Sequence, residues 1–407
     1  MADIASFKAI RPIRDKVHLV ATKPYYFYKK NVLKAKLQSN PFTFLRIINP
    51  EFGNKIKTKP NSNKRFEMVR DGYKEFIDKG ILIQEESSRI YIYRQSRRDF
   101  SCVGVIAGAS IEEYLNDKIK RHEATLTPRE AMFTRYLKIV GYNAEPVLIT
   151  YQGNKNINER INELQMARPE YEFTTTDDIK HELWVLSEDD TLAVQEMFTD
   201  IPSSYIADGH HRSASSVRLL QSGQNTYRNS KYFLSYFVEE QQLTIYEFNR
   251  LVKSLNGLTK EEFIDRLSTL GEIKKLKEKV SPSQEHHINI CIDEQWYELK
   301  INAKLIDNNS PVNSLDSSIL TEYILNPILG ISDIKTSKQI DFLPGSFTIE
   351  EFEEYFTKHK FKVGFLLYPV QIQQIKNVAD HGLNMPPKST WIEPKLRSGL
   401  TIYNIKE

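Results

Sequence analysis

The sequence predicts an α+β protein of two or three domains, in which mixed sheets are packed by helices. Short apolar runs typical of buried strands, such as residues 103–107 and 231–238, alternate with stretches of helical periodicity at Phe66, Val69 and Tyr73. Helix-capping sequences recur along the chain. With 407 residues, 40% of them hydrophobic, the chain is long enough to form more than one core.

The first expected region, residues 1–100, combines short strands with one long helix. Apolar side chains at helical spacing predict a helix over residues 66–77, which Gly80 would end. Extended segments are expected at 9–12 and 17–21, and a hairpin is expected from 81–84 and 90–94.

The second expected region, residues 101–250, opens with the buried strand 103–107. Capping boxes at 110–113 and 127–130 predict two helices, and the second would end at Gly141. Further strands are expected at 146–151, 182–186, 204–207 and 231–238.

The third expected region, residues 251–407, has caps at 259–262 and 348–351, each opening a helix. Alternating residues predict a hairpin from 288–293 and 296–301, and a buried strand at 363–370 precedes a helix that ends at Gly382.

Composition excludes several classes of protein. A net charge of +3 and a pI near 8.5 argue against a dedicated nucleic-acid binder. No apolar run reaches the roughly 18 residues of a membrane helix, and residues 1–10 lack a signal-peptide core. Cys102 and Cys291 lie far apart without metal-type spacing. A cytoplasmic protein is expected, and it could form a homo-oligomer.

The densest group of reactive side chains is Asp208, Gly209, His210, His211 and Arg212. The strand 204–207 leads into this glycine turn, and a helix is expected over 212–220. A helix start offers unpaired N–H groups, which bind phosphate or carboxylate. The side chains add a base, metal ligands and an anion clamp. The alternative is a solvated turn whose histidines only hydrogen-bond to backbone.

A second candidate group is His122 and Glu123, in the loop expected between two helices. It is not a zinc-protease motif, because Leu126 stands where the second histidine would be needed. Loops hold many catalytic groups. Alternatively, the loop is a polar connector in which Glu123 caps the following helix.

A third candidate group lies in the proline-rich segment 385–399. Three prolines keep the backbone extended, and Lys388, Ser389, Thr390 and Lys395 form a plausible phosphate-binding set. It is not a Walker loop, since no glycine-rich sequence precedes the lysine. The alternative is a basic loop that packs Trp391 and exposes its lysines.

Six motifs together resemble the bacterial domain-of-unknown-function family 1015 over nearly the full length. They are FKAIRP at 7–12, KPY at 23–25, NPFTFL at 40–45, HEAT at 122–125, DGHHR at 208–212 and PKSTWIEP at 387–394. The DGHHR turn is also similar, over roughly 40 residues, to the signature of the ParB/sulfiredoxin-like superfamily. Free-serine kinases of that superfamily carry a similar turn, so a ParB/sulfiredoxin-like strand–turn–helix element is expected within residues 101–250.

The second resemblance implies phosphoryl transfer between a small hydroxy amino acid, serine or phosphoserine, and a nucleotide or water. Gly209 and the N–H groups at the helix start would cradle a phosphate, and Arg212 would neutralise its charge. Glu123 or Asp208 would accept the hydroxyl proton or activate water. Magnesium and an adenine nucleotide are the expected cofactors.

Other polar residues would assist this reaction. His210 or His211 would hold a magnesium-bound water, act as a general acid or orient the carboxylate. Lys388 and Lys395 would close over the substrate.

Two other classes of function remain open. In a metal-dependent hydrolase, His122, Asp208, His210 and His211 would bind a transition metal. A nucleotide-gated regulator resembling ParB would bind nucleotide without turnover and would need a basic DNA-binding face. The sequence offers no helix-turn-helix and its charge is balanced, so nucleic acid is not the expected partner.

Overall fold

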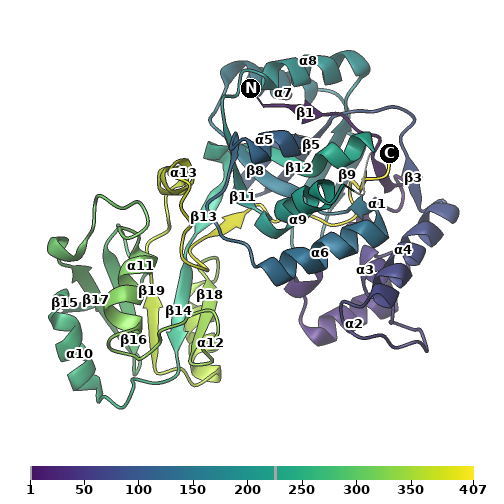
Figure 1. Cartoon of the computed structure of the whole chain (residues 1–407). Coiled ribbons are helices and arrows are strands. Elements are labelled where there is room, and N and C mark those ends of the chain that lie inside the picture. Colours follow the sequence, from purple (N-terminus) through teal and green to yellow (C-terminus); the bar gives the residue numbers. More distant parts are fainter. Residues whose placement is uncertain (1, 224–226) are drawn as a thin grey trace. The chain divides into compact units, whose positions relative to one another are not determined.

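The computed structural model describes residues 2–223 and 227–407, which form two compact units (Figure 1). The first unit comprises Met1–Arg121, Thr125–Leu243 and Pro394–Glu407, and the second comprises His122–Ala124 and Thr244–Glu393. The second unit's long segment begins close to the boundary expected near residue 250, whereas residue 100 lies inside the first unit. The predicted α+β class is confirmed.

The first unit is built on a nine-stranded mixed sheet with the order β6-β11-β8-β12-β5-β4-β10-β9, to which β1 adds beside β5. The central strand β12 pairs in parallel with β8 and antiparallel with β5. The strands are β1 Ile4–Ala5, β4 Tyr91–Arg97, β5 Phe100–Ser110, β6 Ile119–Lys120, β8 Val147–Tyr151, β9 Tyr171–Thr174, β10 Lys180–Val185, β11 Ser204–Asp208 and β12 Tyr232–Glu239.

Helices and two small sheets complete the first unit. The small sheets pair β2 (Ile10–Pro12) with β3 (Leu82–Gln84), and β7 (Tyr142–Asn143) with β21 (Tyr403–Asn404). The helices are α1 Val17–Val20, η1 Tyr25–Phe27, α2 Lys30–Ser39, α3 Phe44–Ile48, α4 Asn63–Asp78, α5 Ile111–Leu115, α6 Thr127–Val140, α7 Lys155–Leu164, α8 Glu188–Phe198, α9 His210–Gln221, η2 Arg228–Lys231 and η3 Glu240–Gln242.

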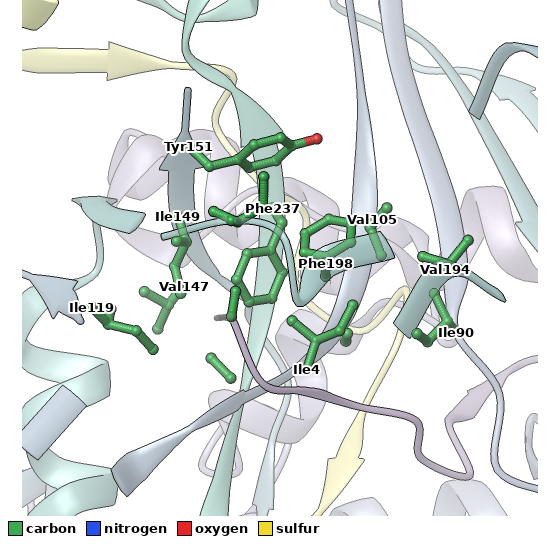
Figure 2. Packing of buried hydrophobic residues seen from close by; sticks show 14 of the residues in the cluster. Ile4, Ile90, Val105, Ile119, Val147, Ile149, Tyr151, Val194, Phe198 and Phe237 are labelled. Carbon is green, nitrogen blue, oxygen red and sulfur yellow. The ribbon is translucent and has the colours of Figure 1, made fainter. Parts of the chain in front are cut away.

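The main core of the first unit lies on one face of the large sheet, as Figure 2 shows. Phe198, the last residue of α8, is fully buried. Its ring centroid lies 5.6 Å from that of Phe237 and 5.3 Å from that of Tyr151. Helix α8 thereby packs onto β8, which neighbours β11, and onto β12, which neighbours β8. Ile206 of β11 belongs to the same close-packed core, which therefore holds the strand that ends at Asp208.

The second unit is an antiparallel six-stranded sheet with the order β15-β17-β16-β19-β14-β18. Its strands are β14 Phe248–Val252, β15 Gly271–Lys275, β16 His287–Ile292, β17 Gln295–Ile301, β18 Ile340–Pro344 and β19 Val363–Leu366, with a separate pair of β13 Thr244–Tyr246 and β20 Trp391–Glu393. Its helices are α10 Lys260–Ser268, η4 Ala303–Leu305, α11 Asp316–Leu320, a π-helix at Thr321–Leu325, α12 Ile349–Lys358 and α13 Ile372–Asp380.

Three local predictions are wrong. Residues 17–20 form helix α1 rather than an extended segment. The expected hairpin of 81–84 with 90–94 does not form, because β3 pairs with β2 while β4 pairs with β5 and β10. Thr127 does not cap α6. It is the first residue of the helix, and the Thr125 hydroxyl bonds instead to Glu130.

Within residues 2–223 and 227–407, no helix combines the length and the apolar character needed to cross a membrane.

Candidate functional site

The DGHHR turn joins strand β11 to helix α9, as the sequence predicts. Strand β11 ends at Asp208, and Gly209 has a φ of 101° directly before His210 opens the helix. A Cβ at position 209 would lie 3.0 Å from the Arg212 guanidinium. The left-handed backbone favours glycine here, and a larger residue would also push the Arg212 side chain away.

Four charged side chains of the first unit form a network at this turn. Asp208 Oδ2 lies 3.3 Å from Lys395 Nζ and 3.6 Å from Arg212 Nη2. On its other side, Arg212 Nη1 lies 3.0 Å from Glu145 Oε1 and also donates to the Pro146 carbonyl. Two carboxylates and two cations thus meet at the start of α9, and their formal charges cancel.

The network keeps Asp208 and Arg212 ionised. Burial by itself would raise the pKa of Asp208, but the charges of Lys395 and Arg212 outweigh it and lower that pKa. Burial by itself would lower the pKa of Arg212, but the charges of Glu145 and Asp208 raise it. Asp208 is therefore a carboxylate at neutral pH.

The depressed pKa of Asp208 predicts how the network responds to acid. A carboxyl group whose pKa is lower in the folded state adds stability above its unfolded pKa, near 3.8, and loses it as the pH falls through the folded value. Because the pair is partly screened by solvent, we expect the wild-type protein to be more stable than Lys395→Met by a small margin above about pH 5, and to lose that margin as the pH falls below about 3.8.

Urea unfolding at a series of pH values measures this difference. Lys395→Arg keeps the charge and serves as the control, so it should follow the wild type. A wild-type advantage that stays constant down to pH 3 would show that Lys395 stabilises the fold by packing alone.

The two histidines of the turn occupy different surroundings. His210 is buried, whereas His211 is partly exposed. Burial lowers the pKa of His211, Arg129 lowers it further, and Glu130 opposes them. His211 is therefore neutral at pH 7. Its buried Nδ1 has no hydrogen-bond partner among the described residues.

Two residues that the sequence analysis did not consider adjoin the network. Glu145, just before β8, is held by Arg212 and by the Ser398 hydroxyl, whose Oγ lies 3.1 Å from Glu145 Oε2. Tyr26, in η1, has a pKa raised by burial and by the negative charges of Glu145 and Asp208, although 62% of the residue is exposed. In the sequence, Glu145 is marked only as a carboxylate just before a predicted strand. Tyr26 is marked only as an aromatic residue that follows the KPY motif.

The remaining predicted site residues belong to the second unit. His122 is buried, and its carbonyl accepts a 2.8 Å hydrogen bond from the Met385 N–H. Glu123 is the next residue of the same short segment. The segment 122–124 is thus fastened to the start of the proline-rich stretch.

In that stretch, Lys388 is exposed, with a φ of 60° and its Nζ 4.9 Å from the centroid of the Phe248 ring. Ser389 is buried and its Oγ lies 3.1 Å from Ser317 Oγ. Thr390 is partly exposed just before β20. Ser389 also lines a small cavity with Glu247, Asp316, Ser317, Tyr368 and Gln374. That these residues join the DGHHR turn in one site stays a prediction.

No group of three or more His, Cys, Asp or Glu residues is arranged to hold a metal ion in the part of the chain that the structure describes. The four residues considered as transition-metal ligands, His122, Asp208, His210 and His211, therefore do not form such a group. Asp208 instead pairs with the cations Lys395 and Arg212.

The chain was compared with protein families, with curated proteins and with solved structures. The model of a family described as "Protein of unknown function (DUF1015)" matches residues 4–318. No curated protein matches the chain.

Similar solved structures include a mutant free serine kinase in complex with AMP (13% identity, TM-score 0.38, 73% of this chain and 92% of that chain). A second is a conserved hypothetical protein from Pyrococcus furiosus (14% identity, TM-score 0.36, 73% of this chain and 95% of that chain). A third is a C-terminally truncated SbnI from Staphylococcus aureus (11% identity, TM-score 0.36, 73% of this chain and 87% of that chain).

Proposed function

The chain belongs to the family described as "Protein of unknown function (DUF1015)", and we propose that it transfers a phosphoryl group between a small hydroxy amino acid and an adenine nucleotide or water. Serine or phosphoserine is the proposed amino acid. The observation that supports this most is the ionised Asp208 at the start of α9, with Lys395 Nζ at 3.3 Å and Arg212 Nη2 at 3.6 Å.

The turn can bind a phosphate through backbone and side chains together. The N-terminus of α9 has no side-chain cap, because Gly209 precedes it. Its N–H groups and the helix dipole favour an anion. Lys395 and Arg212 would add charge-assisted hydrogen bonds to phosphoryl oxygens.

The charge balance of the network favours a magnesium ion as cofactor. Because the charges of Asp208, Glu145, Arg212 and Lys395 cancel, a phosphate dianion would find little net attraction from the side chains alone. Asp208 and Glu145 both contact Arg212, so two carboxylates are available at one place, and Mg²⁺ commonly uses one or two carboxylates plus substrate phosphates. When bound, it would neutralise charge on those phosphates.

Asp208 is our candidate for the group that takes the proton from the serine hydroxyl, or activates water in the reverse direction. His211, which is neutral at pH 7, is the alternative general base. Glu123 remains the other candidate for this carboxylate, and His122, Lys388, Ser389 and Thr390 keep their proposed roles in catalysis or substrate binding.

Phosphate binding at the turn is tested by Arg212→Ala. We expect the affinity for phosphoserine or ADP, measured by calorimetry with Mg²⁺, to fall by about 1.5–3 kcal/mol, the range for losing a charged hydrogen bond. This corresponds to roughly 10- to 150-fold in Kd. Omitting Mg²⁺ should weaken binding to the wild type as well.

Arg218→Ala is the matched control, since Arg218 lies on the same helix but pairs with Glu130. The melting temperature of each variant shows whether the fold is kept, and Arg212→Lys retains the charge if the alanine variant unfolds. Equal affinity of Arg212→Ala and wild type would exclude the turn as the phosphate site.

A further inference from the structure

The positive charge of this protein is concentrated in one short segment. Residues 23–64 contain ten Lys and Arg against a single acidic residue, Glu51, which is a formal charge of +9. Because the whole chain carries only +3, the remaining residues are net acidic. The nearly balanced net charge of the whole chain therefore conceals a strongly basic stretch, residues 23–64, which we call the basic segment.

Most cations of the basic segment are not used to stabilise the fold. Seven of its lysines are exposed and have no ion pair with any described residue: Lys29, Lys30, Lys34, Lys55, Lys57, Lys59 and Lys64. Lys23 pairs with Asp177, and Lys36 Nζ lies 5.5 Å from the centroid of the Tyr28 ring. Like charges left unpaired in this way cost stability, which favours an external anionic partner.

The parts of the basic segment are tied together. Arg46 Nη2 donates to the Leu37 carbonyl at the end of α2, and its guanidinium lies over the Phe52 ring. Glu51 bonds to Thr58 and to Arg65 of α4. The lysines of α2 and those of residues 55–64 therefore belong to one connected substructure.

Two exposed aromatic rings belong to the same segment of the chain. Tyr25 and Tyr26 are 58% and 62% exposed, and their ring centroids lie 5.8 Å apart. Helix α2 buries Leu37 and presents Lys30 and Lys34, one turn apart, to solvent. Apart from Val32 and Ala35, the exposed residues of α2 are charged or polar, which disfavours insertion into a lipid surface.

We propose that the basic segment binds single-stranded nucleic acid. Flexible lysines would follow the phosphate backbone, and exposed tyrosines would stack on unpaired bases, which is how proteins bind single strands without reading their sequence. This proposal does not depend on the phosphoryl transfer proposed above.

The test is fluorescence anisotropy with a labelled single strand of about 20 nucleotides, at salt concentrations between about 50 and 200 mM. The full-length wild type should bind, with an affinity that falls steeply as salt rises. The triple variant Lys29→Glu, Lys30→Glu, Lys34→Glu should bind at least about 10-fold more weakly. Its slope of log K against log salt should be smaller by about 2, since each neutralised phosphate contributes about 0.7.

The matched control is Lys277→Glu, Lys304→Glu, Lys338→Glu, which makes the same charge change at exposed lysines of the second unit. It should bind like the wild type. Tyr25→Ala should weaken binding and Tyr25→Phe should restore it, because stacking needs the ring and not the hydroxyl.

Three results would overturn the proposal: no anisotropy change for the wild type at the lowest salt, equal weakening in both triple variants, or tighter binding of a duplex of the same length. A parallel experiment tests whether the protein sediments with vesicles rich in phosphatidylserine. If the protein sediments with these vesicles but does not bind the oligonucleotide, the basic segment binds a membrane surface and the nucleic-acid partner is rejected.

Discussion

Asp208→Asn is expected to lower turnover at least about 100-fold while leaving the melting temperature nearly unchanged. Asparagine keeps the shape of the side chain but cannot accept a proton or carry the negative charge, and general acid–base catalysis typically contributes 10²–10⁴-fold. The side chain of Asp208 is 37% exposed, so its pairing with Lys395 and Arg212 is screened by solvent and contributes little to folding. Steady-state kinetics and thermal melts on the same preparations give both quantities.

Asp190→Asn is the control for this variant. Asp190 also pairs with an arginine, Arg160, but lies at the start of α8, in none of the three groups proposed as the site. It should keep normal turnover. If Asp208→Asn instead lowers the melting temperature strongly and loses activity only in proportion, Asp208 is a structural residue of the turn.

Phe198→Ala is expected to destabilise the first unit by about 3–5 kcal/mol, the usual cost of deleting a buried phenylalanine ring. Its ring is fully buried and packs against those of Tyr151 and Phe237 (Figure 2), so its removal leaves a cavity that the sheet cannot close. Chemical denaturation followed by circular dichroism measures the change.

Leu192→Ala provides the comparison, because Leu192 lies on the same helix α8 and is 61% exposed. It should change the free energy of unfolding by less than about 0.5 kcal/mol. If both variants lower the free energy of unfolding by a similar amount, the side chains of α8 stabilise the protein through helix formation and not through packing in the core.

The features predicted correctly from the sequence are those determined by near neighbours along the chain. The capping boxes at Thr259 and Thr348 form as expected, since each needs only a residue three positions on. The strand–turn–helix at 204–220 follows from a short apolar strand, a glycine and a helix. Where the outcome depends on distant partners, prediction failed. Residues 81–94 have the local pattern of a hairpin, but β3 and β4 pair with different strands.

The residues of the candidate site likewise include some that the sequence reveals and some that only the fold brings together. The DGHHR residues are consecutive, so their grouping is visible in the sequence. Glu145 lies 67 positions before Arg212 in the chain (212 − 145), and Ser398 reaches Glu145 from the C-terminal end. No local pattern connects these positions. Lys395 was predicted from the composition of its own segment, and its distance of 3.3 Å from Asp208 is a result of the fold.

The proposed phosphoryl transfer is tested most directly by phosphorus NMR of the full-length protein with Mg²⁺ and phosphoserine, alone and with AMP, ADP or ATP. We expect the phosphoserine signal to fall as inorganic phosphate or a more highly phosphorylated nucleotide appears. Because forward and reverse reactions share one transition state, Glu123→Gln or His211→Ala should slow both together. No conversion of phosphoserine under any of these conditions, in protein that still binds nucleotide, would contradict the proposed reaction and favour a nucleotide-binding regulator.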